Sequence, residues 1–165
     1  MIETVFEKIT GQLIHHSARF RVVNHPAAGR SEEVAAVRGT QMGQGAKALV
    51  CHLKKADGES YVLAVLAADL QADLKKLAEA LGAKKASLAS PAEVLRLTGC
   101  VPGAIPPFSL HPELELVVDP ALFDRFDEIA FNAGSLERSV ILNAQDYLSV
   151  TCPERIHFAR TTEDK

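Results

Sequence analysis

The sequence predicts an α+β fold built on a mixed sheet, and three observations carry this prediction. Segments with helical periodicity alternate with β-prone apolar runs along the 165 residues. Two of these runs, 46–53 and 61–67, are separated by the turn-forming stretch 56–59, which is typical of an antiparallel hairpin. Several strand pairs are joined too tightly for parallel crossovers. Because 47% of the residues are hydrophobic, the chain has enough apolar material for one domain spanning 1–165.

Two helical patterns flank a short β-prone run in the first forty residues. Apolar side chains recur every three or four positions in the first segment. The last segment has a serine at its start, acidic residues in its first turn and a terminal glycine, which mark both ends of a helix. These patterns predict a helix from Ile2 to about His15, a strand over Phe20–Val23 that breaks at His25-Pro26, and a helix over Ser31–Gly39 capped by Ser31.

The middle of the chain combines the hairpin with two further helices. Both hairpin strands are apolar at nearly every position, so we expect them at the centre of the sheet. The first helix that follows is amphipathic, and the second begins with Ser as cap, Pro at the first position and Glu at the third. The predicted segments are strands at Ala46–Leu53 and Tyr61–Ala67, a helix over Asp69–Leu81 stopped by Gly82, and a helix from Ser90 to Gly99.

An irregular segment divides the helical middle from a β-rich end. Gly99–Phe108 holds two glycines and three prolines among apolar residues, so it predicts a rigid, partly buried loop. Short apolar runs separated by polar turns follow it. They predict strands at Leu114–Val118, Glu128–Asn132 and Ser139–Leu142, helical turns at Ala121–Phe126 and Ala144–Leu148, and a loose tail over Thr161–Lys165.

Charge and cysteine content narrow the class of protein. The formal net charge of -3, from 18 basic and 21 acidic side chains, argues against a surface that binds nucleic acid everywhere. The front third is different, because residues 1–55 carry a net charge of +4. Cys51, Cys100 and Cys152 are too far apart for a disulfide framework or a zinc knuckle. Without a signal-like start or an apolar stretch of membrane-spanning length, we expect a cytoplasmic protein with no membrane partner.

The familiar signatures of nucleotide-binding and hydrolytic enzymes do not occur in the sequence. It has no glycine-rich dinucleotide fingerprint, phosphate-binding loop, nucleophile elbow or zinc-binding His-Glu-x-x-His. His15-His16 falls at a predicted helix end, where interaction with the helix dipole explains it better than metal binding. Cys51 and His52 alternate across a predicted strand and so cannot bind one ion together. We therefore expect neither a metal nor a cofactor.

Three polar or irregular features have both a structural and a functional interpretation. Lys47 opens an apolar strand after a glycine-rich approach, so its ammonium either reaches the surface or binds an anion in a cleft. The Gly99–Phe108 loop is either a plain crossover or a wall that presents backbone N–H groups to a substrate carbonyl. Asp146 is by default an acid in the first turn of a helix. From the pattern alone the structural interpretation is favoured for all three.

Taken in order, these pieces resemble the YbaK/ProX family of aminoacyl-tRNA deacylases, which includes the editing domain of bacterial prolyl-tRNA synthetases. The resemblance covers about residues 19 to 150. No single motif is distinctive, but the ordered set is fairly specific. The residues on which the resemblance rests are His25-Pro26, residues 31–35, Arg38-Gly39, Gly45–Leu49, the Gly-x-x-x-Pro loop Gly103–Pro107, Asn132-Ala133-Gly134, and Asp146.

The resemblance implies a mixed, largely antiparallel and partly barrel-like sheet surrounded by helices. It also implies hydrolysis, in trans and without metal, of the ester between a wrong amino acid and the 3′-terminal adenosine of a tRNA. Lys47 would hold phosphates of the 3′ end, and the loop from Gly103 would contact the aminoacyl carbonyl. The expected catalytic residues are Lys47, Gly103 and Asp146, and the expected substrate-binding residues are Asn24, His25, Ala104, Pro107, Gly134 and Ser135.

The substrate and the partners are less sharply defined by the resemblance. The expected substrate is a tRNA specific for proline that carries Ala, Cys or Ser. A small amino acid is expected because the small residues of the loop predict a small pocket. Prolyl-tRNA synthetase is an expected partner, and the chain is expected to be a monomer or a weak homodimer. Two alternatives stay open. One is a non-catalytic module that binds the tRNA end or a nucleotide beside a synthetase, and the other is a hydrolase for another small acyl or nucleotide ester.

Overall fold

The computed structural model describes residues 4–160 and confirms the predicted α+β class. Helix α1 (Val5–His15) begins after Thr4, whose hydroxyl accepts a hydrogen bond from Glu7 while the Glu7 carboxylate binds the Thr4 N–H. This reciprocal pair is a capping box, which fixes the start of the helix. The predicted helix is thus confirmed from Val5 onward, and Ile2 lies outside the described residues. The predicted tail over 161–165 also lies outside them.

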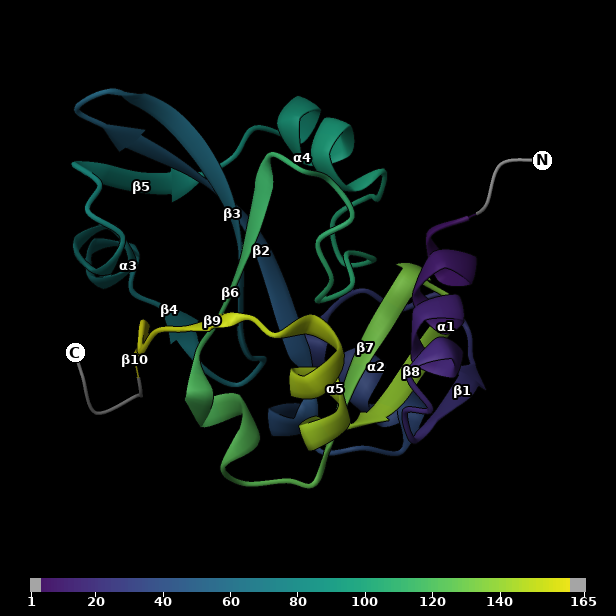
Figure 1. The fold of residues 1–165 in the computed structure, drawn as a ribbon. Coiled ribbons are helices and arrows are strands. Elements are labelled where there is room, and N and C mark those ends of the chain that lie inside the picture. The colour runs from purple at the N-terminus through teal and green to yellow at the C-terminus, as the bar shows by residue number, and fades with distance from the viewer. Residues whose placement is uncertain (1–3, 161–165) are drawn as a thin grey trace.

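A five-stranded sheet forms the centre of the molecule (Figure 1). The predicted hairpin is confirmed, because β2 and β3 pair antiparallel from Ala46 opposite Ala67 to Lys55 opposite Gly58. Strand β6 pairs parallel with β3, and β9 pairs parallel with β6, so the sheet is mixed as expected. In spatial order the strands are β5 (Lys85–Leu88), β2 (Ala46–Lys55), β3 (Gly58–Ala67), β6 (Leu114–Val118) and β9 (Glu154–Arg155).

A second, three-stranded antiparallel sheet lies beside the first one (Figure 1). Its strands are β1 (Phe20–Asn24), β8 (Arg138–Asn143) and β7 (Glu128–Ser135), in that order. A single bridge between Gly45 and Ala130 joins the two sheets at the start of β2. A short third pair is formed by β4 (Gln71–Ala72) and β10 (Ala159–Arg160). Over residues 4–160 the sheets do not close into a barrel.

The helices cover the sheets and are short. In Figure 1, α1 lies against β7 and β8, α3 lies next to β5, and α4 and α5 lie at opposite ends of the central strands. None of the helices in the described part of the chain is long and apolar enough to cross a membrane. Their bounds are α2 (Ser31–Arg38), η1 (Met42–Gln44), α3 (Leu74–Ala80), α4 (Pro91–Thr98), η2 (Pro120–Phe123) and α5 (Ala144–Thr151).

Strand β3 is buried on both faces, which explains its unbroken apolar run. Leu63 and Val65 belong to the core between the two sheets, together with Ile9, Phe131 and Tyr147. Alternate β3 residues on the other face pack with Leu77 of α3 and with Phe158 in a second core. Because successive side chains of a strand point to opposite faces, a strand between two cores must be apolar throughout. The central placement predicted for the hairpin is confirmed for β3.

Two predicted helix starts are wrong. The helix expected over Asp69–Leu81 begins only at Leu74, because the Asp73 carboxylate caps it by accepting from the backbone N–H groups of Lys75 and Lys76. The preceding residues form β4, which pairs with a strand far along the chain. The helix over 31–38 is capped by Arg30 without a side-chain bond, so Ser31 is its first residue rather than its cap.

Candidate functional site

A cavity of about 350 Å³ lies between α2, the first half of β2, α4, β7 and the loop before β6. Much of its wall is apolar, with Val34 and Ala35 of α2 facing Ala48 of β2 and Val94 of α4. Its polar side chains include Lys47, Arg38, Ser31 and Asn132, which come from three different elements. An apolar hollow with a few convergent polar groups is the usual form of a small-molecule site.

The cavity runs along an open edge of β2. Strand β5 pairs with β2 only from Cys51 to Lys54, and Ala89 donates a further hydrogen bond to the Val50 carbonyl. Among the described residues no strand pairs with this edge over Ala46–Leu49. Since every backbone carries donors and acceptors, an unpaired edge offers hydrogen bonds to a ligand. This feature depends on the length of β5, which the sequence analysis did not predict.

Lys47 lines the cavity and is half-buried. Its ammonium donates to the Leu70 carbonyl at 2.7 Å and retains further donors. Burial lowers the pKa of Lys47, and the nearby Asp69 carboxylate opposes this effect. Asp69 is itself held by two 2.7 Å hydrogen bonds from Arg125. Lys47 is thus a half-buried cation at the cavity wall, and its role in anion binding stays a prediction.

A buried hydrogen-bond network forms the floor of the cavity. Arg38 is only 8% exposed, and it donates through Nε to the Ser139 hydroxyl at 2.8 Å and through Nη2 to the side-chain oxygen Oδ1 of Asn132 at 3.1 Å. Ser139 also binds Asn132, at 2.9 Å, and the imidazole Nε2 of His25, at 2.7 Å. Burial lowers the pKa of Arg38 to about 10, so the guanidinium stays charged at neutral pH. Among the described residues it has no acidic partner within 4.0 Å.

The loop that holds Gly103 forms another part of the cavity wall, next to the floor network. The Asn132 amide donates to the carbonyls of Ala28 and Gly103, both at 2.8 Å, and so ties two loops to β7. Gly103 has φ +88°, and a Cβ there would stand 3.1 Å from the Gly29 Cα. Only glycine allows this conformation and this close approach together. The Gly103 N–H makes no hydrogen bond within residues 4–160 and is available to a ligand.

Asp146 lies at the start of α5 and binds Arg19. Its carboxylate accepts from the Arg19 backbone N–H at 2.8 Å and from the guanidinium at 2.9 and 3.1 Å. These hydrogen bonds lower the pKa of Asp146. The position in the first helical turn agrees with its structural interpretation. Asp146 is not among the described residues that line the cavity.

The structure brings two of the predicted site residues, Lys47 and Gly103, to the cavity wall. His25 reaches the floor network through Ser139. The other predicted residues hold neighbouring backbone in place. The Gly134 N–H donates to the Ala104 carbonyl at 2.9 Å, and the Pro107 carbonyl accepts from the Tyr147 hydroxyl at 2.6 Å. The Ser135 hydroxyl accepts from the Glu137 N–H at 3.1 Å. Asn24 pairs with Arg138 at the end of β1.

Sequence reasoning missed Arg38, Asn132 and Ser31 as site residues. Arg38 and Asn132 enter the sequence analysis among the residues that carry the family resemblance, but with no role in the site. A sharper signal was present, because Val34, Ala35 and Arg38 share the buried face of α2. A charge on the apolar face of a helix needs a partner or a ligand. For Asn132 and Ser31 no comparable signal exists in the sequence.

The comparisons with known proteins bear on this geometry. Residues 25–150 match the family model described as the aminoacyl-tRNA editing domain. The chain belongs to the aminoacyl-tRNA editing domain family. The predicted family, and with it the class of an aminoacyl-tRNA editing enzyme, is confirmed. The matched segment contains all the polar cavity residues named above. No group of three or more His, Cys, Asp or Glu side chains in the described part of this editing domain is placed to hold a metal ion.

Individual relatives and solved structures resemble the editing domain along nearly its whole length. A protein of Escherichia coli strain K12, named multifunctional Ser/Thr-tRNA deacylase ProXp-y, is 59% identical over 155 residues, which is 94% of this chain and 93% of that protein. A crystal structure of a hypothetical protein has a TM-score of 0.82 at 22% identity, covering 93% of this chain and 100% of its own. The structure of a proposed trans-editing enzyme for prolyl-tRNA synthetase has a TM-score of 0.79 at 23% identity, covering 98% and 100%. The two structures support the fold.

Proposed function

We propose that this protein acts in trans to hydrolyse seryl or threonyl esters at the 3′ end of mischarged tRNA. The observation that carries the proposal is the 59% identity, over 94% of the chain, to a protein named as a Ser/Thr-tRNA deacylase. Of the amino acids expected from the sequence, serine is shared with that name. Alanine and cysteine, the choice of a proline tRNA, the association with prolyl-tRNA synthetase, the oligomeric state and the cytoplasmic location stay predictions.

The cavity is suited to the end of a tRNA rather than to its body. Its volume of about 350 Å³ lies at the lower end of the range for small-molecule pockets. A terminal adenosine carrying a small amino acid has this scale. We assign Lys47 to the phosphate side, because its ammonium keeps donors beyond the one bound to Leu70. We assign the Gly103 N–H to the aminoacyl group, because it has no hydrogen-bond partner in the described residues.

For this ester hydrolysis the protein needs only to position the water and the ester and to stabilise the negative charge that develops on the carbonyl oxygen. A water oxygen bonds to the ester carbonyl carbon, the bond from that carbon to the ribose oxygen breaks, and one water proton ends on the ribose oxygen. The products are a free amino acid and a tRNA with its terminal hydroxyl restored. Fixed N–H donors that stabilise the oxyanion, together with an ordered water, accelerate such a step. A catalytic triad is not required.

Ser31 can form a hydrogen bond with a hydroxyl on the side chain of the substrate's amino acid. The Ser31 hydroxyl lines the wall and makes no hydrogen bond to other described residues. The Asn132 amide, in contrast, is already occupied at both its oxygen and its nitrogen. A hydroxyl on the substrate can therefore pair with Ser31, whereas an alanyl side chain cannot. This arrangement supports serine and threonine as the removed amino acids.

The direct experiment measures loss of label from tRNA charged with Ser, Thr, Ala, Cys or Pro. We expect hydrolysis of the seryl and threonyl esters above the rate without enzyme and little hydrolysis of the prolyl ester. Binding of charged tRNA without hydrolysis of any ester would instead favour the non-catalytic module. Hydrolysis of acylated adenosine with no preference for tRNA would favour a general ester hydrolase.

Replacing Lys47 tests the assignment to the phosphates. In Lys47→Ala we expect KM for seryl-tRNA to rise roughly tenfold or more, because a charge-assisted hydrogen bond is worth about 1.5–3 kcal/mol. Steady-state deacylation and a tRNA-binding titration measure the effect. Lys54→Ala is the matched control, since Lys54 lies on the same strand with an exposed side chain. Unchanged KM and unchanged affinity in Lys47→Ala would contradict the assignment.

A further inference from the structure

We propose that the Arg38 guanidinium contacts the carbonyl oxygen of the scissile ester and stabilises the negative charge that develops there. This inference rests on the proposed esterase function and adds a catalytic residue to it. The oxygen of an aminoacyl ester is the ligand, and its oxyanion in the tetrahedral intermediate is the species bound most tightly.

Burial and charge make Arg38 unusual in this molecule. The side chain is more than nine-tenths buried, and within residues 4–160 no carboxylate lies within 4.0 Å of it. Other arginines of the described chain, such as Arg19, Arg96 and Arg125, are far more exposed and each binds an acid. A buried cation without a counterion is costly, so proteins retain it where an anion completes the site.

Two of the three guanidinium nitrogens are already committed to the protein. Nε binds the Ser139 hydroxyl and Nη2 binds the Asn132 side chain, which fixes the plane of the group. Nη1 makes no hydrogen bond to the described residues, and it lies 4.0 Å from the point where a Cβ would stand on Gly45. Gly45 and Arg38 both line the cavity. The uncommitted donor is thus placed on the wall shared with Gly45.

Asn132 links this donor to the Gly103 loop. Its side-chain oxygen accepts from Arg38 at 3.1 Å, and its amide donates to the Gly103 carbonyl at 2.8 Å. One side chain therefore helps to set the positions of Arg38 Nη1 and of the Gly103 N–H, both of which remain free to donate to a ligand. Two donors held in place before the substrate arrives are the arrangement that favours a developing oxyanion over a neutral carbonyl.

The same geometry argues against a phosphate as the partner of Arg38. A phosphate carries its full charge before and after the reaction, and Lys47, which is half-buried on the cavity wall, already offers it a cation. Arg38 belongs instead to the buried hydrogen-bond network at the cavity floor. A phosphate contact would affect binding, whereas an oxyanion contact affects the rate of the chemical step.

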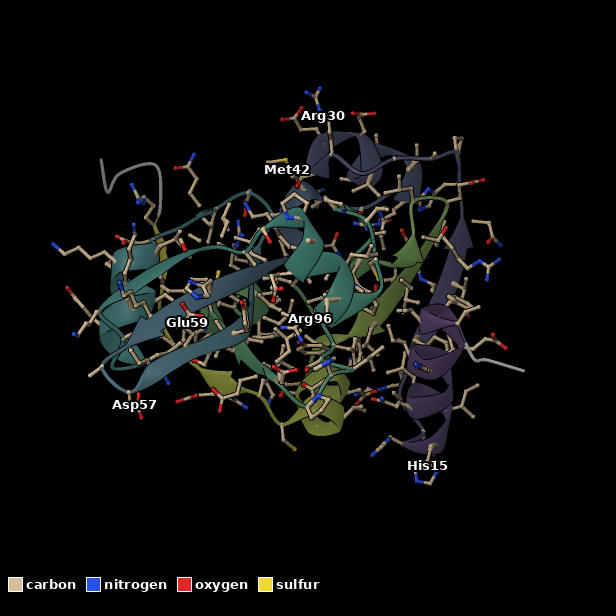
Figure 2. The ribbon with its side chains drawn as sticks, turned by 90° about the horizontal axis from the view of Figure 1, so that it is seen from above. His15, Arg30, Met42, Asp57, Glu59 and Arg96 are labelled. Carbon is tan, nitrogen blue, oxygen red and sulfur yellow. The ribbon has the colours of Figure 1, made fainter. Side chains whose placement is uncertain are left out.

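The test compares Arg38→Met with Arg30→Met in steady-state and single-turnover deacylation of seryl-tRNA. Met keeps an unbranched side chain as far as the position of Nε but removes the charge and the donors. We expect kcat of Arg38→Met to fall roughly 10²–10³-fold, the usual loss for one oxyanion donor, with affinity for uncharged tRNA unchanged. Arg30 is the matched control, because it precedes α2 with its side chain 87% exposed and pointing away from the body of the protein (Figure 2).

A second variant keeps the inference testable if Arg38→Met does not fold. Arg38→Lys retains a positive charge in the same buried place, where burial lowers the pKa of a lysine more readily than that of an arginine. We expect its rate, corrected for spontaneous hydrolysis, to fall relative to wild type as pH rises from about 7 to 9. A merely structural role for Arg38 would give a ratio that does not change with pH.

The outcomes separate this inference from the proposed function. A wild-type protein that hydrolyses no aminoacyl-tRNA overturns the proposed function. An active wild type with a folded Arg38→Met variant of unchanged kcat overturns the role of Arg38 alone. A raised KM with unchanged kcat assigns Arg38 to a phosphate and also overturns the inference.

Discussion

Gly134 shows how a single residue can be fixed by its neighbours. Its φ is +82°, and a Cβ at this position would stand 2.8 Å from the Val5 Cβ of α1. Its N–H binds the Ala104 carbonyl, which secures the loop that follows α4. The residue therefore lets α1 pack closely on β7 while it holds the loop of the candidate site. Its predicted place in the substrate pocket stays a prediction.

We expect Gly134→Ala to lower the free energy of unfolding by about 2 kcal/mol or more, because strain at positive φ adds to a clash with Val5. Urea denaturation followed by circular dichroism measures the change. Gly82→Ala is the matched control, since Gly82 has φ +68° but no atom within 4 Å of an added Cβ. Equal losses for the two variants would show that the contact with α1 contributes nothing.

Arg38 and Lys47 show why residue type alone does not reveal a site. Both are single cations in apolar segments. A lysine within an apolar strand is unusual and therefore indicates a candidate site, whereas an arginine in the last turn of a helix is expected there. The structure places both on one cavity. The anion-binding interpretation of Lys47 stays a prediction. The place of Arg38 could not be predicted from the sequence, because its two partners come from β7 and β8.

At the scale of elements, the contact between Asp146 and Arg19 fastens α5 to the start of β1. The carboxylate accepts three hydrogen bonds from Arg19, and Asn143 at the helix cap also binds the Arg19 guanidinium at 3.0 Å. The hydrogen bonds from Arg19 lower the pKa of Asp146 below its ordinary value. A carboxylate with a lowered folded-state pKa stabilises the fold above its unfolded pKa, and this contribution is lost as pH falls through the folded pKa.

We expect Asp146→Asn to lower Tm near neutral pH, and we expect the difference from wild type to shrink below about pH 4 as Asp146 becomes protonated. Thermal denaturation across pH measures it. Asp57→Asn, at the exposed hairpin tip (Figure 2), is the control that removes one carboxylate without this contact. A difference that is independent of pH would contradict the ionic origin. The catalytic role of Asp146 stays a prediction, and an unchanged kcat in the same variant would contradict it.

Elements with signals in their own sequence were predicted well, and elements that depend on distant partners were not. Helix α4 has its Ser90 cap, Pro91 start and left-handed Gly99 end as predicted, and all three signals are local. In contrast, β5 pairs with the end of β2, and β4 pairs with β10 near the end of the described chain. Such short strands carry too few residues for a periodic pattern, so only their partners define them.

At the scale of the whole molecule, net charge limits how the tRNA is held. A chain with a net charge of -3 is poorly suited to grip a long phosphate backbone. The cation assigned to phosphate, Lys47, lies in the front third, which carries the net positive charge. This arrangement favours contact confined to the acceptor end.

We expect the logarithm of tRNA affinity to fall with the logarithm of salt concentration with a slope of about -2, which corresponds to two or three phosphates of a single strand. Titrations at several salt concentrations, with full-length tRNA and with an acceptor-stem minihelix, measure the slope. Both RNAs should bind with similar affinity. A slope of about -7, or a large loss of affinity for the minihelix, would instead indicate extended backbone contact.

The fold class, the central hairpin, helix α4 with both its ends, and the family could be predicted from the sequence alone. These depend on residues close together in the chain or on an ordered set of short motifs. The tertiary structure alone decided which residues meet at the cavity. Asn132 binds Ala28 and Gly103, which lie 104 and 29 residues away, and through them it sets the wall that faces Lys47 and Arg38. Contacts over such separations leave no periodic trace, because they form only when the sheets and loops have packed.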